Sequence, residues 1–208
     1  MFTIIPVVST AVYSRWRIPI PTPSPLSKDR TRTRERILAA AKIAFASDGY
    51  AAANMRDIAA KAGISAALVV RYFGSKQQLF AEAVAEAFDL RQAFAGIDRA
   101  ALGRAFVVPL FSDQREDDLM SMMLRAAVDP AINPLARQLA QERMLEPLAA
   151  LIGGADAERR ASLLLSLVTG IWLYRFLLPV APLTSAADDE TINRVAALIQ
   201  SIIDAEDE

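Results

Sequence analysis

The sequence predicts an all-α protein of about nine helices, and three observations lead to this fold class. Apolar residues recur at helical spacing through most of the 208 residues. Capping residues and glycines divide the chain into segments of helix length. Runs of alternating apolar and polar residues, which predict half-buried strands, are absent. With 53% hydrophobic residues, such helices can bury a substantial core.

The composition excludes several classes of function. The chain has no cysteine and no histidine. Disulfides, thiolate nucleophiles and cysteine zinc sites are therefore impossible, and so are serine-histidine triads and most transition-metal sites. Carboxylate and lysine chemistry stay open, but no clustered carboxylate pair or phosphate loop is evident. We expect no cofactor, no metal site and no enzymatic activity.

Charge is divided unevenly along the chain, although the net charge is only −1. Residues 28–76 carry ten Lys and Arg against four acidic residues, whereas residues 77–208 carry 11 basic and 20 acidic residues. A local excess of positive charge attracts polyanions. The segment 28–76 is therefore the candidate nucleic-acid-binding domain, and 77–208 is the candidate regulatory and dimerisation domain.

Residues 1–27 are predicted to form an N-terminal extension. Five prolines interrupt any regular element there. The opening apolar run is short and lacks a basic region before it, which argues against a secretory signal. The extension is interpreted as a disordered arm or as the product of an over-extended start codon. DNA or membrane contact by Arg15, Trp16 and Arg17 is a weaker interpretation.

The first predicted helix is amphipathic, begins near Asp29 and ends before Gly49. Ile37, Leu38, Ala41 and Phe45 form its apolar side. Arginines occupy every second position at its start, namely Arg30, Arg32, Arg34 and Arg36. They either form a solvated surface or contact phosphates, and their density on an entry segment favours phosphates.

Residues 54–73 have the layout of a helix-turn-helix. Asn54 is a candidate cap for a first short helix, with Asp57 three residues later. Gly63 suits a helix end that needs positive φ. Ser65 caps a second helix that ends at Gly74, and a third helix begins at Lys76 after Ser75. In such motifs the second helix enters the DNA major groove.

The second helix offers few groups that read bases. Ala66, Ala67 and Leu68 can touch thymine methyl groups, whereas Arg71 and Tyr72 are its polar side chains. An arginine can make a bidentate contact to guanine. Base recognition is therefore expected to depend mainly on Arg71.

Six further helices are expected after the motif. Prolines and paired glycines separate them, and Pro147 is expected to kink the fourth. Their predicted ranges are 76–94, 98–112, 117–128, 134–151, 156–178 and 188–204.

The two last helices are predicted to form a dimer interface. Ser162, Ser166 and Gly170 recur every four residues and make a ridge that lets two backbones approach. A membrane span is the alternative for 156–178, but Arg175 lies inside it and a proline follows it closely. The final helix would add its apolar stripe to a four-helix interface, through Ile192, Val195 and Ile199.

Methionines, aromatic residues and two arginines in the acidic part are candidates for an effector pocket. Met and aromatic side chains suit an adaptable apolar ligand, and an arginine in an apolar helix needs a partner. Core packing is an equally good interpretation for the apolar ones. The candidates are Phe88, Met120, Met123, Arg125, Trp172 and Arg175.

Residues 34–80 resemble the N-terminal DNA-binding domain of the tetracycline-repressor-like (TetR/AcrR) transcription regulators. The matching segments are Arg36-Ile-Leu-Ala-Ala-Ala, Phe45, Gly49-Tyr50, Met55-Arg-Asp-Ile-Ala, Ala62-Gly-Ile-Ser65, Tyr72-Phe73, Ser75-Lys76 and Leu79. About 15 positions match in order at the family's spacing, over roughly a quarter of the chain. The remainder is similar only in being helical, with two late apolar helices.

The resemblance implies a cytoplasmic, ligand-responsive repressor that binds a palindromic operator on double-stranded DNA as a homodimer. It implies that Asn54, Met55 and Arg56 lie where the family grips the DNA backbone, and that Lys76 contacts a phosphate. Val70 departs from the family, which often has a phosphate-binding tyrosine there. The implied effector is small and apolar or amphipathic, and no membrane partner is expected.

Two other functions remain open on the sequence alone. One is a helical carrier or enzyme whose DNA-binding motif is vestigial. The other is a nucleoid-type protein that binds DNA without an effector.

Overall fold

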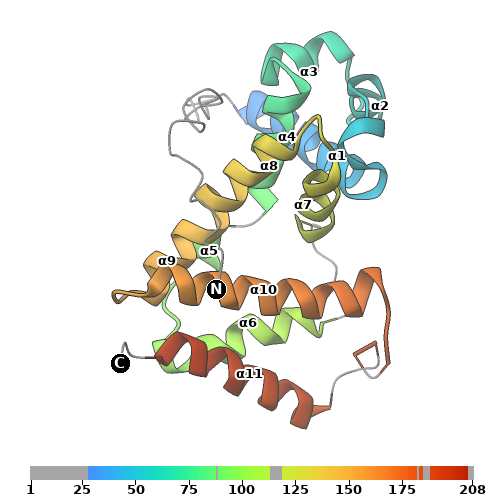
Figure 1. The fold of residues 1–208 in the computed structure, drawn as a ribbon. Coiled ribbons are helices and arrows are strands. Elements are labelled where there is room, and N and C mark those ends of the chain that lie inside the picture. The colour runs from blue at the N-terminus through green and yellow to red at the C-terminus, as the bar shows by residue number, and fades with distance from the viewer. Residues whose placement is uncertain (1–27, 88, 113–118, 182, 185–187, 206–208) are drawn as a thin grey trace, which may run out of the picture.

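A computed structural model describes residues 28–87, 89–112, 119–181, 183–184 and 188–205, and every regular element in these ranges is helical (Figure 1). The all-α prediction is therefore confirmed. The elements are α1 (Lys28–Ala52), α2 (Met55–Lys61), α3 (Ala66–Phe73), α4 (Lys76–Ala87), α5 (Leu90–Ala93), η2 (Arg99–Ala101), α6 (Leu102–Leu110), α7 (Leu119–Val128), α8 (Asn133–Leu139), η3 (Ala140–Leu145), α9 (Glu146–Ile152), α10 (Ala157–Trp172), η4 (Leu173–Leu177) and α11 (Asp189–Asp204).

The first hydrophobic core joins α1–α4 to α7 and α8, at the upper end of Figure 1. Phe45 and Phe80 are fully buried in it and meet edge to face, with ring centroids 5.2 Å apart. Tyr50 stacks on Phe45 at 6.0 Å. Met122 of α7 and Leu139 of α8 are buried in the same core. Helices from the acidic part of the chain thus complete the core beneath the helix-turn-helix.

The first helix contains a break at the predicted place. Gly49 has φ 78° and ψ 170°, which is not helical, and α1 continues for one more turn beyond it. A residue with a side chain is strained at this φ. The regular part of α1 therefore ends where the sequence indicated. The predicted helix 76–94 is shorter than expected, because α4 ends at Ala87 and α5 is a separate turn.

The second hydrophobic core lies among α5, α6, α9, α10 and α11. Helix α11 packs most closely on α6, at Gly103. A Cβ atom at Gly103 would lie 2.3 Å from the Ala196 carbonyl oxygen, a distance that real Cβ atoms do not adopt. The absence of a side chain at residue 103 therefore sets how near the two helices lie.

Helices α8 and α9 are the two halves of one long helical run that reaches both cores. The π-helical segment η3 joins them. Pro147 follows directly, at the first turn of α9. A proline inside a helix lacks an N–H and its ring collides with an earlier carbonyl, and a widened turn relieves both problems. The structure thus contains a π-segment just before Pro147, in the helical run that the sequence predicted as one helix.

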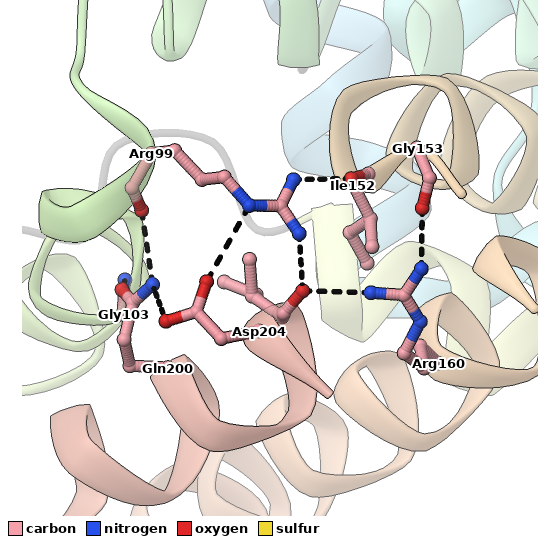
Figure 2. A network of polar contacts seen from close by, with 8 residues as sticks. Arg99, Gly103, Ile152, Gly153, Arg160, Gln200 and Asp204 are labelled. Atoms are coloured by element: carbon pink, nitrogen blue, oxygen red, sulfur yellow. Dashed lines mark hydrogen bonds and ion pairs between the residues drawn. The ribbon is translucent and has the colours of Figure 1, made fainter. Parts of the chain in front are cut away.

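Two guanidinium groups hold the ends of α9 and α11 together (Figure 2). Arg160 is only 7% exposed, and it donates to the carbonyl oxygens of Ile203 (2.7 Å) and Gly153. Arg99 donates to the same Ile203 oxygen and to Ile152. Cations favour helix C-termini, where unpaired carbonyl groups carry partial negative charge. These contacts fix the C-terminal end of α11 against the long helical run.

One stretch of the described residues is long and apolar enough to cross a membrane, namely Ala157–Leu177. About a third of its most apolar window is buried inside the subunit (33%). It forms α10 and η4 and packs on α9, α11 and α6. The packing therefore gives this stretch a place within the fold.

Candidate nucleic-acid interface

The helix-turn-helix has the caps and turns that the sequence predicts. The Asn54 side-chain oxygen accepts hydrogen bonds from the backbone N–H groups of Arg56 and Asp57, both at 2.9 Å. Ser65 caps α3 by accepting from the Leu68 N–H at 3.3 Å. Gly63 has a φ of 66° in the turn. Helices α2 and α3 are thus set at their angle by short-range hydrogen bonds.

Helix α3 presents a mixed surface to solvent. Val69 and Phe73 are buried in the first core and anchor the helix. Of the predicted DNA-contacting residues, Ala67 and Arg71 are exposed, whereas Ala66, Leu68 and Tyr72 are half-buried. Val70 is 49% exposed although it is apolar. The exposed surface of α3 therefore combines one guanidinium group with small apolar side chains.

The four arginines of α1 divide into two pairs. Arg30 and Arg32 are exposed at its start. Arg34 forms an ion pair with Glu82 of α4 and lies over the Phe73 ring, 5.7 Å from its centroid. Arg36 donates to the Ala62 carbonyl oxygen in the turn of the motif. The second pair thus ties α1 to α3, α4 and the turn, and the structure gives Arg34 an internal partner where a phosphate contact was expected.

Asn54, Met55 and Arg56 lie together at the start of α2. The Asn54 oxygen caps the helix, and its amide nitrogen donates to the Asp57 carboxylate. Met55 packs against the first core, so its side chain is only half-exposed. Arg56 is exposed and carries a positive charge next to the helix N-terminus. Arg56 is thus the freest of the three to meet a phosphate.

The Lys76 side chain contacts the end of α1. Its ammonium group donates to the Ala51 carbonyl oxygen at 3.2 Å and lies 4.5 Å from the centroid of the Tyr50 ring. Burial lowers the pKa of Lys76, and the carboxylate of Asp129 acts in the opposite direction. The predicted phosphate-binding lysine is thus held by contacts within the subunit.

Two family profiles match this chain. The profile described as "Bacterial regulatory proteins, tetR family" matches residues 37–83, which include most of α1, all of α2 and α3, and most of α4. The profile described as "Tetracyclin repressor-like, C-terminal domain" matches residues 100–203, half of the chain. The chain belongs to the TetR family. It is therefore a DNA-binding transcription regulator. A comparison with curated proteins found no significant match.

Solved structures of transcription regulators have the same fold, and the first of the three that follow is described as a TetR-family regulator. A regulator from Streptomyces coelicolor A3 is 27% identical with a TM-score of 0.57, and the match covers 88% of this chain and all of that one (100%). A second, from Streptomyces coelicolor A3(2), is 26% identical with a TM-score of 0.59, over 84% and 99% of the two chains. A third, from Saccharomonospora viridis, was solved in complex with choline. It is 22% identical with a TM-score of 0.56, over 83% and 96%, and supports the fold alone.

Two residues close to the helix-turn-helix of this TetR-family protein were not predicted from the sequence. Glu82 is a charged residue within the apolar run of α4, only 8% exposed, and it holds Arg34. A charge in an apolar helix needs a partner, so the same signal that marked Arg175 was available for Glu82. Val70 departs from the family pattern, and its exposure places it on the outer surface of α3.

The structure does not bring the predicted effector-binding residues into one site. Met123 is buried in the first core, whereas Met120 packs against the second. Arg125 is exposed, and its aliphatic stem lies across Gly49, 3.8 Å from where a Cβ atom would be. Its aliphatic stem is thus packed against α1 at the first core, away from Trp172 and Arg175. Phe88 lies outside the described residues.

Trp172 and Arg175 remain together at the junction of α10 and η4. Trp172 is half-buried against the second core, with the Phe176 ring 5.8 Å away. Arg175 is buried and donates to the Leu183 carbonyl oxygen at 2.7 Å. Its guanidinium lies 5.2 Å from the ring centroids of Phe111 and Phe176. The buried cation is thus surrounded by aromatic rings and backbone carbonyl groups.

The predicted dimer residues fall into two groups. Ser162 and Ser166 are exposed on α10 and Gly170 is half-exposed, with 55% exposed Leu163 beside them. Ile199, by contrast, is completely buried against the second core (0%), so its assignment to the interface is wrong. Helix α11 turns its apolar stripe inward, because α6 is the surface that it covers.

Two more predicted dimer residues are neither fully exposed nor fully buried. Ile192 and Val195 are half-buried on α11 and pack against the second core. Leu198, 51% exposed, lies on the outward side of that helix instead.

The described residues contain no cluster of acidic side chains suited to a metal ion.

Proposed function

We propose that this TetR-family regulator is a ligand-responsive repressor that binds a palindromic operator as a homodimer. The observation that carries the proposal is the outward surface of α3, where Val70 and Arg71 are exposed above a helix anchored by Val69 and Phe73. One short helix reads only a few base pairs, and a second copy related by a two-fold axis would read a matching half-site.

DNA binding is expected to use two kinds of contact, one to base edges and one to phosphates. Arg71 is the exposed guanidinium on α3 and suits a guanine edge, which specifies sequence. Arg30, Arg32, Arg56 and Lys76 surround the motif and suit phosphates, which position the protein without reading bases. The functional division of the chain follows, with DNA binding in residues 28–76 and regulation and dimerisation in 77–208.

Arg71→Ala and Lys76→Ala are expected to weaken DNA binding in different ways. Arg71→Ala should reduce operator affinity by roughly tenfold or more while leaving affinity for random DNA almost unchanged, because a base contact is lost. Lys76→Ala should weaken operator and random DNA alike and flatten the salt dependence by about one counterion, because a phosphate contact is lost. Titrations of both DNAs at several salt concentrations separate these outcomes. Equal losses on both DNAs for both variants would refute the division.

The outer face of α10, formed by Ser162, Leu163, Ser166 and Gly170, is proposed as the dimer interface. Small residues there let a second copy approach closely, and Leu163 supplies exposed apolar area. Leu163→Glu is expected to weaken the dimer by at least about tenfold, since a buried unpaired carboxylate is costly. Val128→Glu is the matched control. Val128 is also an exposed apolar residue, but it lies on α7, outside the proposed interface. Sedimentation of both variants tests this, and an unchanged dimer in Leu163→Glu would exclude this face.

A small apolar or amphipathic effector is proposed to release the DNA. The structural neighbour solved with choline supports this, since it is a regulator of this fold with a small molecule bound. The region around Trp172 and Arg175 is the best candidate contact, with aromatic rings on either side of the guanidinium. The effector must bind more tightly to the form whose recognition helices are wrongly spaced for DNA.

A cytoplasmic, non-enzymatic protein follows from this function. An electrophoretic shift with DNA upstream of the protein's own gene separates it from the alternatives. A specific shift that a ligand abolishes supports the repressor. No shift at low salt would favour a carrier or enzyme with a vestigial motif, and a shift without sequence preference would favour a nucleoid-type protein.

A further inference from the structure

The solvent-facing side of α3 is a strip of exposed residues. They lie next to one another or three to four positions apart, so they share one side of the helix. Figure 1 shows α3 at the end of the molecule farthest from α11. The strip consists of Ala67, Val70 and Arg71, and it continues at the exposed C-cap residue Gly74.

Val70 is the apolar side chain that stands out from this strip. It is 49% exposed, whereas Val69 beside it is completely buried. Its neighbours one turn away on the exposed side are Ala67, three positions before it, and Gly74, four positions after it. A methyl group and a hydrogen atom cannot shield Val70 from an approaching surface. The two methyl groups of Val70 are therefore available to a partner on this side of α3.

The position of these methyl groups is well defined. A valine in a helix has one strongly preferred χ1 rotamer, because its branched Cβ collides with the preceding turn in the others. The backbone beneath it is held by the burial of Val69 and Phe73 and by the Ser65 cap. The Arg34 guanidinium lies over the Phe73 ring, 5.7 Å from its centroid. A contact to Val70 thus costs little additional side-chain entropy.

A valine suits one kind of group in the DNA major groove. The base edges there carry hydrogen-bond donors and acceptors, and thymine adds an apolar methyl group at C5. In 5-methylcytosine the same methyl group stands at the same ring position. Against a polar edge, valine would displace water and return no hydrogen bond, which costs free energy. The side chain of Val70 therefore favours a pyrimidine that carries a methyl group at C5.

The other apolar residues at the start of α3 are less suited to this contact. Ala66 and Leu68 are half-buried, and Ala67 is exposed but carries a single methyl group close to the backbone. Arg71, next to Val70, suits a guanine. Successive residues of a helix are about 1.5 Å apart along its axis, so the two side chains are expected to meet the same or neighbouring base pairs.

We propose that Val70 is a specificity-determining residue that recognises the C5 methyl group of a pyrimidine in the operator. The proposal rests on the DNA-binding role proposed for α3. It gives each half-site two recognised features, a guanine at Arg71 and a methyl-bearing pyrimidine at Val70. Base recognition by this helix therefore does not depend on Arg71 alone.

The test uses duplexes that the wild-type protein selects from a random-sequence library. In the selected site, each thymine is replaced in turn by deoxyuridine, which removes only the methyl group. Each cytosine is replaced in turn by 5-methylcytosine, which only adds one. We expect binding to weaken roughly three- to fivefold at one thymine of a half-site, or to strengthen by a similar factor at one cytosine. The first result assigns thymine as the source of the methyl group, and the second assigns 5-methylcytosine.

Val70→Ala should lose this dependence on the methyl group and keep its affinity for random-sequence DNA. Alanine is a better helix former than valine, so α3 stays intact, and thermal unfolding verifies this. Val108→Ala is the matched control, since Val108 is 48% exposed and lies on α6, away from the helix-turn-helix. It should respond to both sets of modified duplexes as the wild type does.

A dependence on the methyl group that persists in Val70→Ala would overturn the proposal, because another side chain would then make the contact. A wild-type protein that selects a sequence but responds to no added or removed methyl group would overturn it as well. In both cases the proposed operator binding would stand. A wild-type protein that selects no sequence would contradict the proposed function itself, and the contact of Val70 with it.

Discussion

Replacing Gly103 by alanine is expected to lower the free energy of unfolding by about 2–3 kcal/mol, because the packing of α11 on α6 leaves no room for a methyl group. The new Cβ atom would lie 2.3 Å from the Ala196 carbonyl oxygen and 2.9 Å from the Gln200 Cβ and backbone nitrogen. Backbone atoms of a helix cannot move aside singly, so α11 would shift as a whole. The better helix propensity of alanine returns only roughly 1 kcal/mol.

Gly170→Ala is the matched comparison for this prediction. A Cβ atom at Gly170 meets nothing within 4 Å in the subunit. This variant should unfold at the same denaturant concentration as wild type, or slightly higher, when the protein is dilute enough to be monomeric. Chemical unfolding followed by circular dichroism measures both. Equal stability of Gly103→Ala and Gly170→Ala would mean that α11 does not pack on α6 as described.

Arg160→Met is expected to destabilise the protein by about 2–4 kcal/mol, because one buried and one half-buried carbonyl group lose a charged donor. These are the carbonyl groups of Gly153 at the end of α9 and Ile203 at the end of α11. Ile203 still has Arg99 as a donor, whereas Gly153 keeps no other donor shown in Figure 2. Methionine fills a similar volume, so the loss comes from polar contacts and not from a cavity.

The neighbouring Arg159 provides the control. Its side chain is 76% exposed and forms an ion pair with Asp156 at 2.8 Å, three residues before it. Exposed pairs of this kind contribute less than about 1 kcal/mol. Arg159→Met should therefore shift the unfolding midpoint little. If both variants were equally mild, the contacts in Figure 2 would be too weak to hold the two helix ends together.

Features governed by near neighbours in sequence were predictable here. The Asn54 and Ser65 caps and the turn at Gly63 depend on residues two or three positions apart, and the structure has all three. Partners far apart were not predictable. Arg34 finds Glu82 48 residues away, and Arg36 finds the Ala62 carbonyl group 26 residues away. Nothing in a one-dimensional pattern indicates which arginine will turn inward.

Amphipathic helices illustrate the same limit in the regulatory part. The stripe on α11 showed that one side of the helix is buried, but not whether its own subunit or a second copy covers it. The structure assigns Ile199 to the subunit's own core, with Ile192 and Val195 at its border. The apolar effector candidates depend on residue type alone, and residue type does not distinguish Met123 in the first core from Met120 at the second.

The π-segment Ala140–Leu145 determines the directions in which the side chains of α8 and α9 point relative to one another. Successive residues of a regular α-helix are rotated by about 100°, so Leu139 and Leu148, nine positions apart, would point in directions about 180° apart. The wider turns of η3 reduce that rotation, and Leu139 meets one core while Leu148 meets the other. Deleting one residue here would restore a regular helix, yet it would aim one of these leucines away from its core. The length of this segment is therefore as constrained as its composition.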